Sequence, residues 1–337
     1  MGATESPVPP GVWVMLGLLS LFGALIAGFT SDHDDDQAED AAPDARTGSG
    51  DDLTDEGGGD GSGGGSGDGG DLIDWADDGA DADIRGSQDD DILDGTAQDE
   101  TLAGLDGDDQ MNGRSGDDAL IGGAGEDRLY GEDGEDSLSG GDGDDTLNGG
   151  AGSDLLLGGN GADDLAGGAD DDLIAAGEGA DTVQGGSGDD SATGGDGDDW
   201  LAGNDGDDSL SGGAGADTLD GNDGDDLLDG SGDGAADFLN GGDGGDSMIL
   251  GAGDWASGGD GADSFTLAPE PGPVPQVNDF NADEDHLVVV YDPATHPDPT
   301  LTLEPGDGGG STLMLDGLPV AVVQGNLTLD ALTLMAA

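Results

Sequence analysis

The chain has 337 residues, and its 80 Asp and Glu residues face only four Lys and Arg, which gives a formal net charge of −76. A chain this acidic repels phosphate groups, so nucleic-acid binding is excluded as a function. Cysteine is absent, which excludes disulfides and thiolate chemistry, and aromatic residues make up only 3% of the sequence.

The first predicted element is an apolar segment at residues 12–29, which runs from Val12 to Phe29 without a charged residue. As a helix at about 1.5 Å per residue it would reach roughly 27 Å, enough to span the hydrocarbon core of a bilayer. We therefore predict that residues 1–30 form a hydrophobic helix that anchors the chain in a membrane. A cleaved signal peptide is the alternative, although such leaders usually begin with basic residues and this one contains Glu5 and no Lys or Arg.

An acidic linker is predicted next. Residues 31–71 are rich in Gly, Ser and Asp and nearly free of large apolar side chains, and residues 57–70 contain no other residue type than these three. This composition is typical of a disordered, self-repelling linker. Residues 72–85, which include Ile73, Trp75 and Ile84, are predicted to form a degenerate cap at the start of the following domain.

From Gly86 to Asp229 a nine-residue motif repeats sixteen times without a change of spacing. Its consensus is G-G-x-G-x-D-x-U-x, in which U is apolar. Position one is Gly in fifteen units, position six is Asp in fifteen, and position eight is apolar in all sixteen. Glycine at positions one, two and four allows a tight six-residue turn, because Gly alone adopts positive φ easily. The x-U-x that follows predicts a short strand with U pointing inward.

The loops offer carboxylates and exposed carbonyls but no sulfur or imidazole, and Ca²⁺ takes 6–8 oxygen ligands. One loop and one strand make half a turn, so two units, 18 residues, close one coil, and the position-six residues stack in two columns. One column begins with Asp91 and Asp109, and the other begins with Glu100 and Asp118. Low hydrophobicity with high charge predicts disorder when cations are absent. About fourteen ions, seven in each column, would add roughly +28.

On these residues the chain resembles the RTX, or hemolysin-type, calcium-binding repeat family, whose signature is this nonapeptide. The resemblance covers residues 77–266. It implies an all-β fold, a right-handed parallel β-roll stabilised by roughly a dozen or more Ca²⁺ ions, each held between consecutive loops of a column. Loop carbonyls such as those of Gly122, Gly125, Gly140 and Gly143 are predicted ligands. The predicted carboxylate ligands are Asp109, Asp118, Asp127, Asp136, Asp145, Asp154, Asp163, Asp172, Asp181, Asp190, Asp199, Asp208, Asp217, Asp226, Asp246 and Asp263.

Some units depart from the consensus, and they are where we expect weaker ion sites. The position-four Gly is replaced in the first two units and again at Asp170, Glu100 replaces Asp at position six, and Ala192 places a small residue in the core row. After Asp229 the register loosens, with an eleven-residue unit at 230–240 and one unit that is a residue short at 250–257. The repeat domain is predicted to span residues 72–266, with regular repeats at 86–229.

The tail, residues 267–337, is predicted to form a small β cap. After a Pro-rich segment, β-prone runs at 287–291, 301–303, 312–315, 318–323 and 327–334 predict four or five antiparallel strands. Residues 278–287 resemble the element that follows the repeats in many RTX proteins. Such proteins are typically exported by type I ABC transporters through an uncleaved C-terminal signal, so the resemblance implies the type I secretion machinery as a partner. That route conflicts with a membrane anchor at residues 12–29.

Three functions fit the sequence. The first is a non-catalytic rod, secreted or at the cell surface, that folds as it binds Ca²⁺ outside the cytoplasm. The second is a secreted hydrolase with its site in residues 267–337. That tail has no nucleophile elbow and no metal-ligand cluster, and the chain has no H-E-x-x-H motif, so we expect no enzyme. The third is an acidic calcium buffer.

Overall fold

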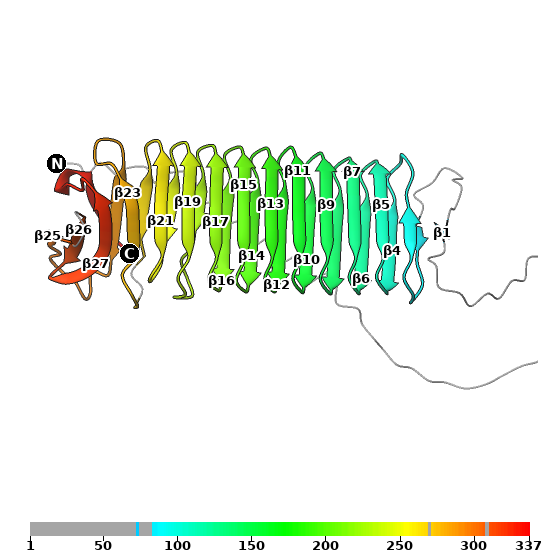
Figure 1. Cartoon of the computed structure of the whole chain (residues 1–337), viewed down its shortest axis with the longest axis horizontal. Helices are drawn as coiled ribbons and strands as arrows, with labels where there is room; N and C mark the ends of the chain where they lie inside the picture. Colours follow the sequence, from blue (N-terminus) through cyan, green and yellow to red (C-terminus); the bar gives the residue numbers. More distant parts are fainter. Residues whose placement is uncertain (1–71, 74–82, 269–270, 307–309) are drawn as a thin grey trace, which may run out of the picture. The chain divides into compact units, whose positions relative to one another are not determined.

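The structure is a computed structural model of the chain and describes residues 72–73, 83–268, 271–306 and 310–337. The predicted N-terminal helix and acidic linker, residues 1–71, lie outside the described residues. The described residues form an all-β parallel solenoid, or β-roll, as predicted (Figure 1). None of their helices is long and apolar enough to cross a membrane.

Two parallel sheets form the roll, and successive strands alternate between them. The first sheet has the order β1 (Leu72–Ile73), β3 (Ile92–Asp94), β5 (Gln110–Ser115), β7 (Arg128–Asp133), β9 (Thr146–Ala151), β11 (Asp164–Ala169), β13 (Thr182–Ser187), β15 (Trp200–Asp205), β17 (Thr218–Asp223), β19 (Phe238–Asp243), β21 (Trp255–Asp260) and β23 (Gln276–Phe280). The second has the order β2 (Asp83–Arg85), β4 (Thr101–Asp106), β6 (Ala119–Ala124), β8 (Ser137–Asp142), β10 (Leu155–Asn160), β12 (Leu173–Glu178), β14 (Ser191–Asp196), β16 (Ser209–Ala214), β18 (Leu227–Asp229), β20 (Ser247–Leu250), β22 (Ser264–Leu267), β24 (His286–Tyr291) and β28 (Leu332–Ala336).

The register of both sheets confirms that two units close one coil. Leu156 on β10 pairs with Leu138 on β8 and with Ile174 on β12, an offset of 18 residues in each direction. The strands are longer than predicted, however, with six residues in most units instead of three. Strand β8 contains the x-U-x triplet and also the first three residues of the next loop. The Gly-Gly pair therefore continues the strand, and only positions four to six make the bend.

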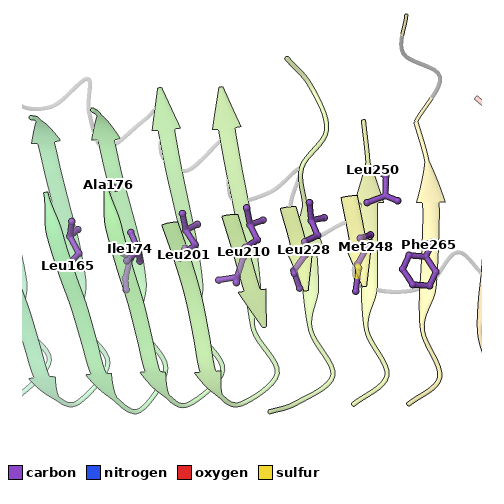
Figure 2. Packing of buried hydrophobic residues seen from close by; sticks show 14 of the residues in the cluster. Leu165, Ile174, Ala176, Leu201, Leu210, Leu228, Met248, Leu250 and Phe265 are labelled. Atoms are coloured by element: carbon purple, nitrogen blue, oxygen red, sulfur yellow. The ribbon is translucent and has the colours of Figure 1, made fainter. Parts of the chain in front are cut away.

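The core is a row of position-eight side chains enclosed between the two sheets (Figure 2). Leu138, Leu147 and Leu156 are at most 1% exposed, and the equivalent residue of every unit from 86 to 229 is buried. Burying a Leu side chain contributes about 1.5–3 kcal/mol. A row one side chain wide gives each coil little apolar burial of its own. Stability therefore depends on stacking many equal coils.

Parallel stacking continues beyond residue 266 into the predicted cap. Strands β23 and β24 extend the two sheets, and β27 (Leu318–Gly325) and β28 pair with them in parallel. The antiparallel arrangement predicted for the cap is confirmed only where β25 (Leu301–Pro305) and β26 (Ser311–Leu315) join β27. It is wrong for the strands at 287–291 and 332–336. The last coil presents two open parallel edges, and these strands satisfy the unpaired backbone groups of those edges. A short 3₁₀ helix, η3 (Leu329–Ala331), precedes β28.

Candidate metal centre

The position-six carboxylates lie in two columns along the bends of the roll, as predicted. All sixteen predicted carboxylate ligands are buried, with at most 3% of each residue exposed. Within a column each backbone N–H donates to the Oδ1 atom of the equivalent Asp one coil later. The Asp127 N–H donates to Asp145 Oδ1 and the Asp145 N–H donates to Asp163 Oδ1, both at 2.8 Å. In the second column the Asp136 N–H donates to Asp154 Oδ1, again at 2.8 Å.

The second oxygen, Oδ2, lacks a hydrogen-bond donor in nearly all of these carboxylates. In fifteen of the sixteen predicted ligands, all but Asp263, the Oδ2 atom is buried and without a hydrogen-bond partner. Leaving a charged oxygen buried and unpaired costs far more than leaving it in water. The repeats therefore place a row of uncompensated acceptor atoms in each column.

The position-one glycines make the space in which these oxygens lie. A Cβ atom added to Gly140 would lie 2.2 Å from Asp145 Oδ2 and 2.7 Å from the carbonyl oxygen of Gly158 in the next coil. The same holds one coil earlier, where a Cβ on Gly122 would lie 2.2 Å from Asp127 Oδ2 and 2.7 Å from the Gly140 carbonyl oxygen. A carboxylate and a carbonyl thus approach one gap without a donor between them, an arrangement that a cation stabilises.

The predicted carbonyl ligands divide into two groups. Those of the position-one residues Gly122 and Gly140 approach the gap that contains a carboxylate Oδ2 atom. Those of Gly125 and Gly143 instead lie against the position-four glycine of the next coil. A Cβ on Gly143 would lie 1.9 Å from the Gly125 carbonyl oxygen, and one on Gly161 would lie 2.0 Å from that of Gly143. Gly143 also has a φ of +136°, so position four requires Gly for its backbone conformation as well as for space.

The donor set fits calcium. Within the described ranges no three His, Cys, Asp or Glu side chains converge on one point. An ion in these gaps would draw on the carboxylates of the column and on several backbone carbonyls. Oxygen ligands of both kinds, in a flexible number, are what Ca²⁺ prefers, whereas Zn²⁺ favours imidazole and thiolate.

Burial raises the pKa of all sixteen predicted carboxylate ligands. Desolvation is the main cause at Asp145, the hydrogen bond from the Asp127 N–H opposes it, and the neighbouring carboxylates of Asp127 and Asp163 raise the pKa further, to about 7. The pKa values of Asp172 and Asp208 are also raised to about 7, mainly by desolvation. Without a cation, the folded columns therefore hold protons at a pH where ordinary carboxyls are ionised.

Calcium binding is expected to weaken in acid. Because the pKa of Asp145 is raised from 3.8 to about 7 in the folded state, the metal-free roll binds more protons than the unfolded chain in the pH window between these two pKa values. Its free energy of unfolding is therefore highest below the window and falls as the pH rises through it. Calcium binds only the ionised form of the folded roll, so calcium-driven folding should need more calcium as the pH falls from about 7 towards the ordinary carboxyl pKa of 3.8. Calcium titrations followed by circular dichroism at several pH values measure this dependence, and a midpoint calcium concentration that does not rise as the pH falls would contradict the assignment.

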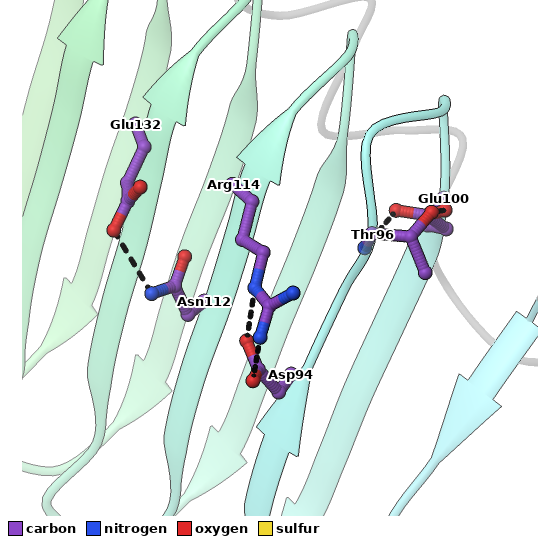
Figure 3. Close-up of polar contacts among 6 residues, drawn as sticks. All are labelled: Asp94, Thr96, Glu100, Asn112, Arg114 and Glu132. Atoms are coloured by element: carbon purple, nitrogen blue, oxygen red, sulfur yellow. Dashed lines mark hydrogen bonds and ion pairs between the residues drawn. The ribbon is translucent and has the colours of Figure 1, made fainter. Parts of the chain in front are cut away.

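The N-terminal ends of both columns are closed by side-chain and backbone donors. Asp91 Oδ2 accepts hydrogen bonds from the Ser87 N–H at 2.5 Å and from the Ser87 hydroxyl at 3.0 Å. Glu100 accepts a hydrogen bond from the Thr96 N–H at 3.0 Å and another from the Thr96 hydroxyl (Figure 3). Ser87 and Thr96 occupy position two, where the consensus has Gly. Both terminal carboxylates are thus satisfied by the protein itself.

The C-terminal ends are closed in the same way, by residues that were not predicted to belong to the columns. Asp254 Oδ2 accepts a hydrogen bond from the Gly251 N–H, and Asp285 Oδ2 accepts one from the Asn281 N–H, both at 2.6 Å. A third unpredicted member, Asp237, continues the first column, since the Asp217 N–H donates to its Oδ1 atom at 2.8 Å. Irregular spacing hid all three residues. The signal that remained was the local pattern of Asp followed two residues later by an apolar core residue.

One interior unit differs at position one. Ala176 is fully buried and replaces the Gly found there in the other regular units. Its methyl group therefore occupies the kind of gap that stays open beside Asp145 and Asp163. Asp181, the carboxylate of the same unit, still has a buried Oδ2 atom without a donor.

The comparison with known families agrees with this geometry. Residues 85–228 match the family described as RTX calcium-binding nonapeptide repeat, in overlapping windows of four copies from 85–120 to 193–228. No protein with a curated description matches the chain significantly.

Proposed function

Residues 85–228 are RTX calcium-binding nonapeptide repeats, and from this premise we propose that the chain is a secreted or cell-surface β-roll that folds outside the cytoplasm as it binds calcium. The observation that carries the proposal is the set of fifteen buried Asp Oδ2 atoms without a hydrogen-bond donor. In a chain with a net charge of −76, these oxygens need cations if the roll is to persist. Metal binding and folding are then one equilibrium.

The proposed location follows from the affinity expected of such sites. Extracellular calcium modules bind with Kd values of about 10⁻⁴–10⁻³ M, well above cytosolic calcium levels. Inside the cell the chain would stay extended and exportable, and outside it would fold as calcium arrives. Export by type I secretion machinery and attachment through residues 12–29 are the two versions of this proposal. They differ in whether the roll remains tethered to a membrane.

Protease accessibility tests both versions. An epitope inserted within residues 57–70 is expected to be cleaved by protease added to intact cells, or to cells of which only the outer membrane has been opened. A cytoplasmic marker protein in the same samples should stay intact. An epitope that remains protected until the cytoplasmic membrane is lysed would rule out both versions and favour an intracellular calcium buffer.

We also propose that the chain is not an enzyme. In the C-terminal region His296 Nδ1 lies 2.7 Å from Asp316 Oδ2, and Asp316 Oδ1 accepts a hydrogen bond from the Thr300 N–H at 2.8 Å. These contacts tie the segment before β25 to the turn between β26 and β27, which is a structural role. Ester or glycoside hydrolysis by the purified chain that is lost in His296→Ala would contradict this proposal.

A further inference from the structure

Exposed aromatic side chains gather on the outer face of the odd-numbered sheet. Trp200 on β15, Phe238 on β19 and Trp255 on β21 are 40%, 54% and 39% exposed. Each is the first residue of its strand, at position seven, next to an inward-pointing core residue. With aromatic residues at only 3% of the sequence, three such residues on one face within four consecutive strands of the sheet are a concentration that core packing does not explain.

Two of these rings form a platform. Phe238 and Trp255 are register partners on adjacent parallel strands. Their ring centroids lie 6.3 Å apart with an interplanar angle of 23°, so the rings are stacked. Parallel pairing sets successive outward side chains about 4.8 Å apart. A linear ligand that crosses the strands would therefore meet a new side chain at each strand.

The platform borders a shallow groove of about 300 Å³. Beside the two rings, its outward polar lining includes the uncharged side chains of Asn240, Ser257 and Asn278. The only carboxylate in the lining, Asp220, accepts a hydrogen bond from Asn240 at 2.7 Å. A second carboxylate lies beside the groove, where Asp279 Oδ2 accepts a hydrogen bond from the Ser257 hydroxyl at 2.6 Å. Both carboxylates thus accept hydrogen bonds from lining side chains, and the groove presents amide and hydroxyl groups beside the two rings.

We propose that this groove binds a neutral polysaccharide. A pyranose ring has flat C–H faces that pack on aromatic rings, and hydroxyl groups at its edge that require polar partners. The exposed ring surfaces of Phe238 and Trp255 would pack against the C–H faces of the sugar chain. The amides of Asn240 and Asn278, which both donate and accept hydrogen bonds, would meet the hydroxyls. The proposal goes beyond calcium binding, because calcium holds the strands that carry the groove but does not touch the ligand.

Charge decides between this occupant and others. An anionic polymer, an anionic lipid surface or a second copy of this chain would be repelled, because about fourteen calcium ions neutralise only part of the net charge of −76. A cationic partner would be attracted to the acidic bends along the whole roll and would have no preference for the groove, where both carboxylates already accept hydrogen bonds. A neutral glycan avoids both effects and matches the lining.

Affinity electrophoresis of the calcium-loaded full chain tests the proposal, with hydroxyethyl cellulose, a soluble β-1,3-glucan or galactomannan in the gel. We expect at least one of these neutral polysaccharides to retard the chain. Phe238→Ala and Trp255→Ala should each weaken binding about tenfold, equivalent to about 1.4 kcal/mol. Ile92→Ala is the matched control. Ile92 also occupies position seven of the odd-numbered sheet and is 39% exposed, but it lies on β3, eight strands from β19 in the sheet order.

Circular dichroism in calcium should be the same for all variants, which separates a binding defect from a folding defect. The absence of retardation in all three gels would overturn the proposal. Retardation that both aromatic variants leave unchanged would overturn it as well. Two further results would also overturn it. One is retardation only by chitosan, a cationic polysaccharide, that disappears at high salt. The other is a dimer that forms with rising protein concentration in analytical ultracentrifugation and is lost in Phe238→Ala.

Discussion

Removing calcium with a chelator is expected to convert the roll into a largely disordered chain, and millimolar calcium is expected to restore β structure cooperatively. The fifteen buried Oδ2 atoms without donors make the metal-free roll unfavourable, and the thin core cannot compensate for them. Each ion that binds only the folded chain stabilises it by RT ln(1 + [L]/Kd), about 2.7 kcal/mol at a hundredfold excess over Kd. Many sites in one cooperative array multiply this effect.

Far-ultraviolet circular dichroism during a calcium titration measures this transition. Magnesium provides the control, because it demands near-ideal octahedral geometry and gives up its water reluctantly, so at equal concentration it should fold much less of the chain. A spectrum that is the same with chelator and with calcium would mean that the columns are not metal sites.

Replacing a single position-one glycine by alanine is expected to remove calcium without removing any ligand side chain. In Gly140→Ala the new methyl group would lie 2.2 Å from Asp145 Oδ2 and 2.7 Å from the Gly158 carbonyl oxygen. The φ angle of Gly140 lies outside the left-handed region, so backbone strain is not the cause. The variant should bind at least one ion fewer and lose about 1–3 kcal/mol of stability in calcium, the usual cost of leaving a buried polar group unsatisfied.

The chain carries the matching control in Ala176, which already has a methyl group at position one. Ala176→Gly opens the gap beside Asp181 and should increase the number of bound ions by one. Native mass spectrometry in calcium counts ions per chain for both variants. Equal counts in the unmodified chain, Gly140→Ala and Ala176→Gly would show that the gaps beside position one are not where the ions bind.

The regular part of the roll was predictable because its signal is repeated and local. An Asp every nine residues, with Leu two residues later, determines the bend, the strand and the core row at once. The spacing of 18 then places Asp127, Asp145 and Asp163 in one column. No comparable signal marked the true strand length. Glycine has no side chain to show the alternation of a strand, so the Gly-Gly pair was assigned to the turn.

The irregular ends were harder to predict, for two physical reasons. Asp237, Asp254 and Asp285 occupy the columns only because the structure absorbs insertions and a deletion between coils, so residue counting cannot find them. The pairing of Leu287 with Leu332 joins strands 45 residues apart. Parallel pairing over such a distance leaves no turn motif in the sequence, whereas the antiparallel pair β26–β27 is joined by Asp316 and Gly317, a recognisable turn.

The closed ends of the two columns have a consequence for how such a chain can change over generations. Ser87 and Thr96 finish the columns at one end, and Gly251 and Asn281 finish them at the other, while the coils between them are interchangeable. A duplication or loss of 18 residues would lengthen or shorten the roll and leave both ends intact. A change of nine residues would instead transfer every later strand to the opposite sheet, together with the C-terminal strands and the aromatic groove. Selection on length should therefore proceed in steps of whole coils.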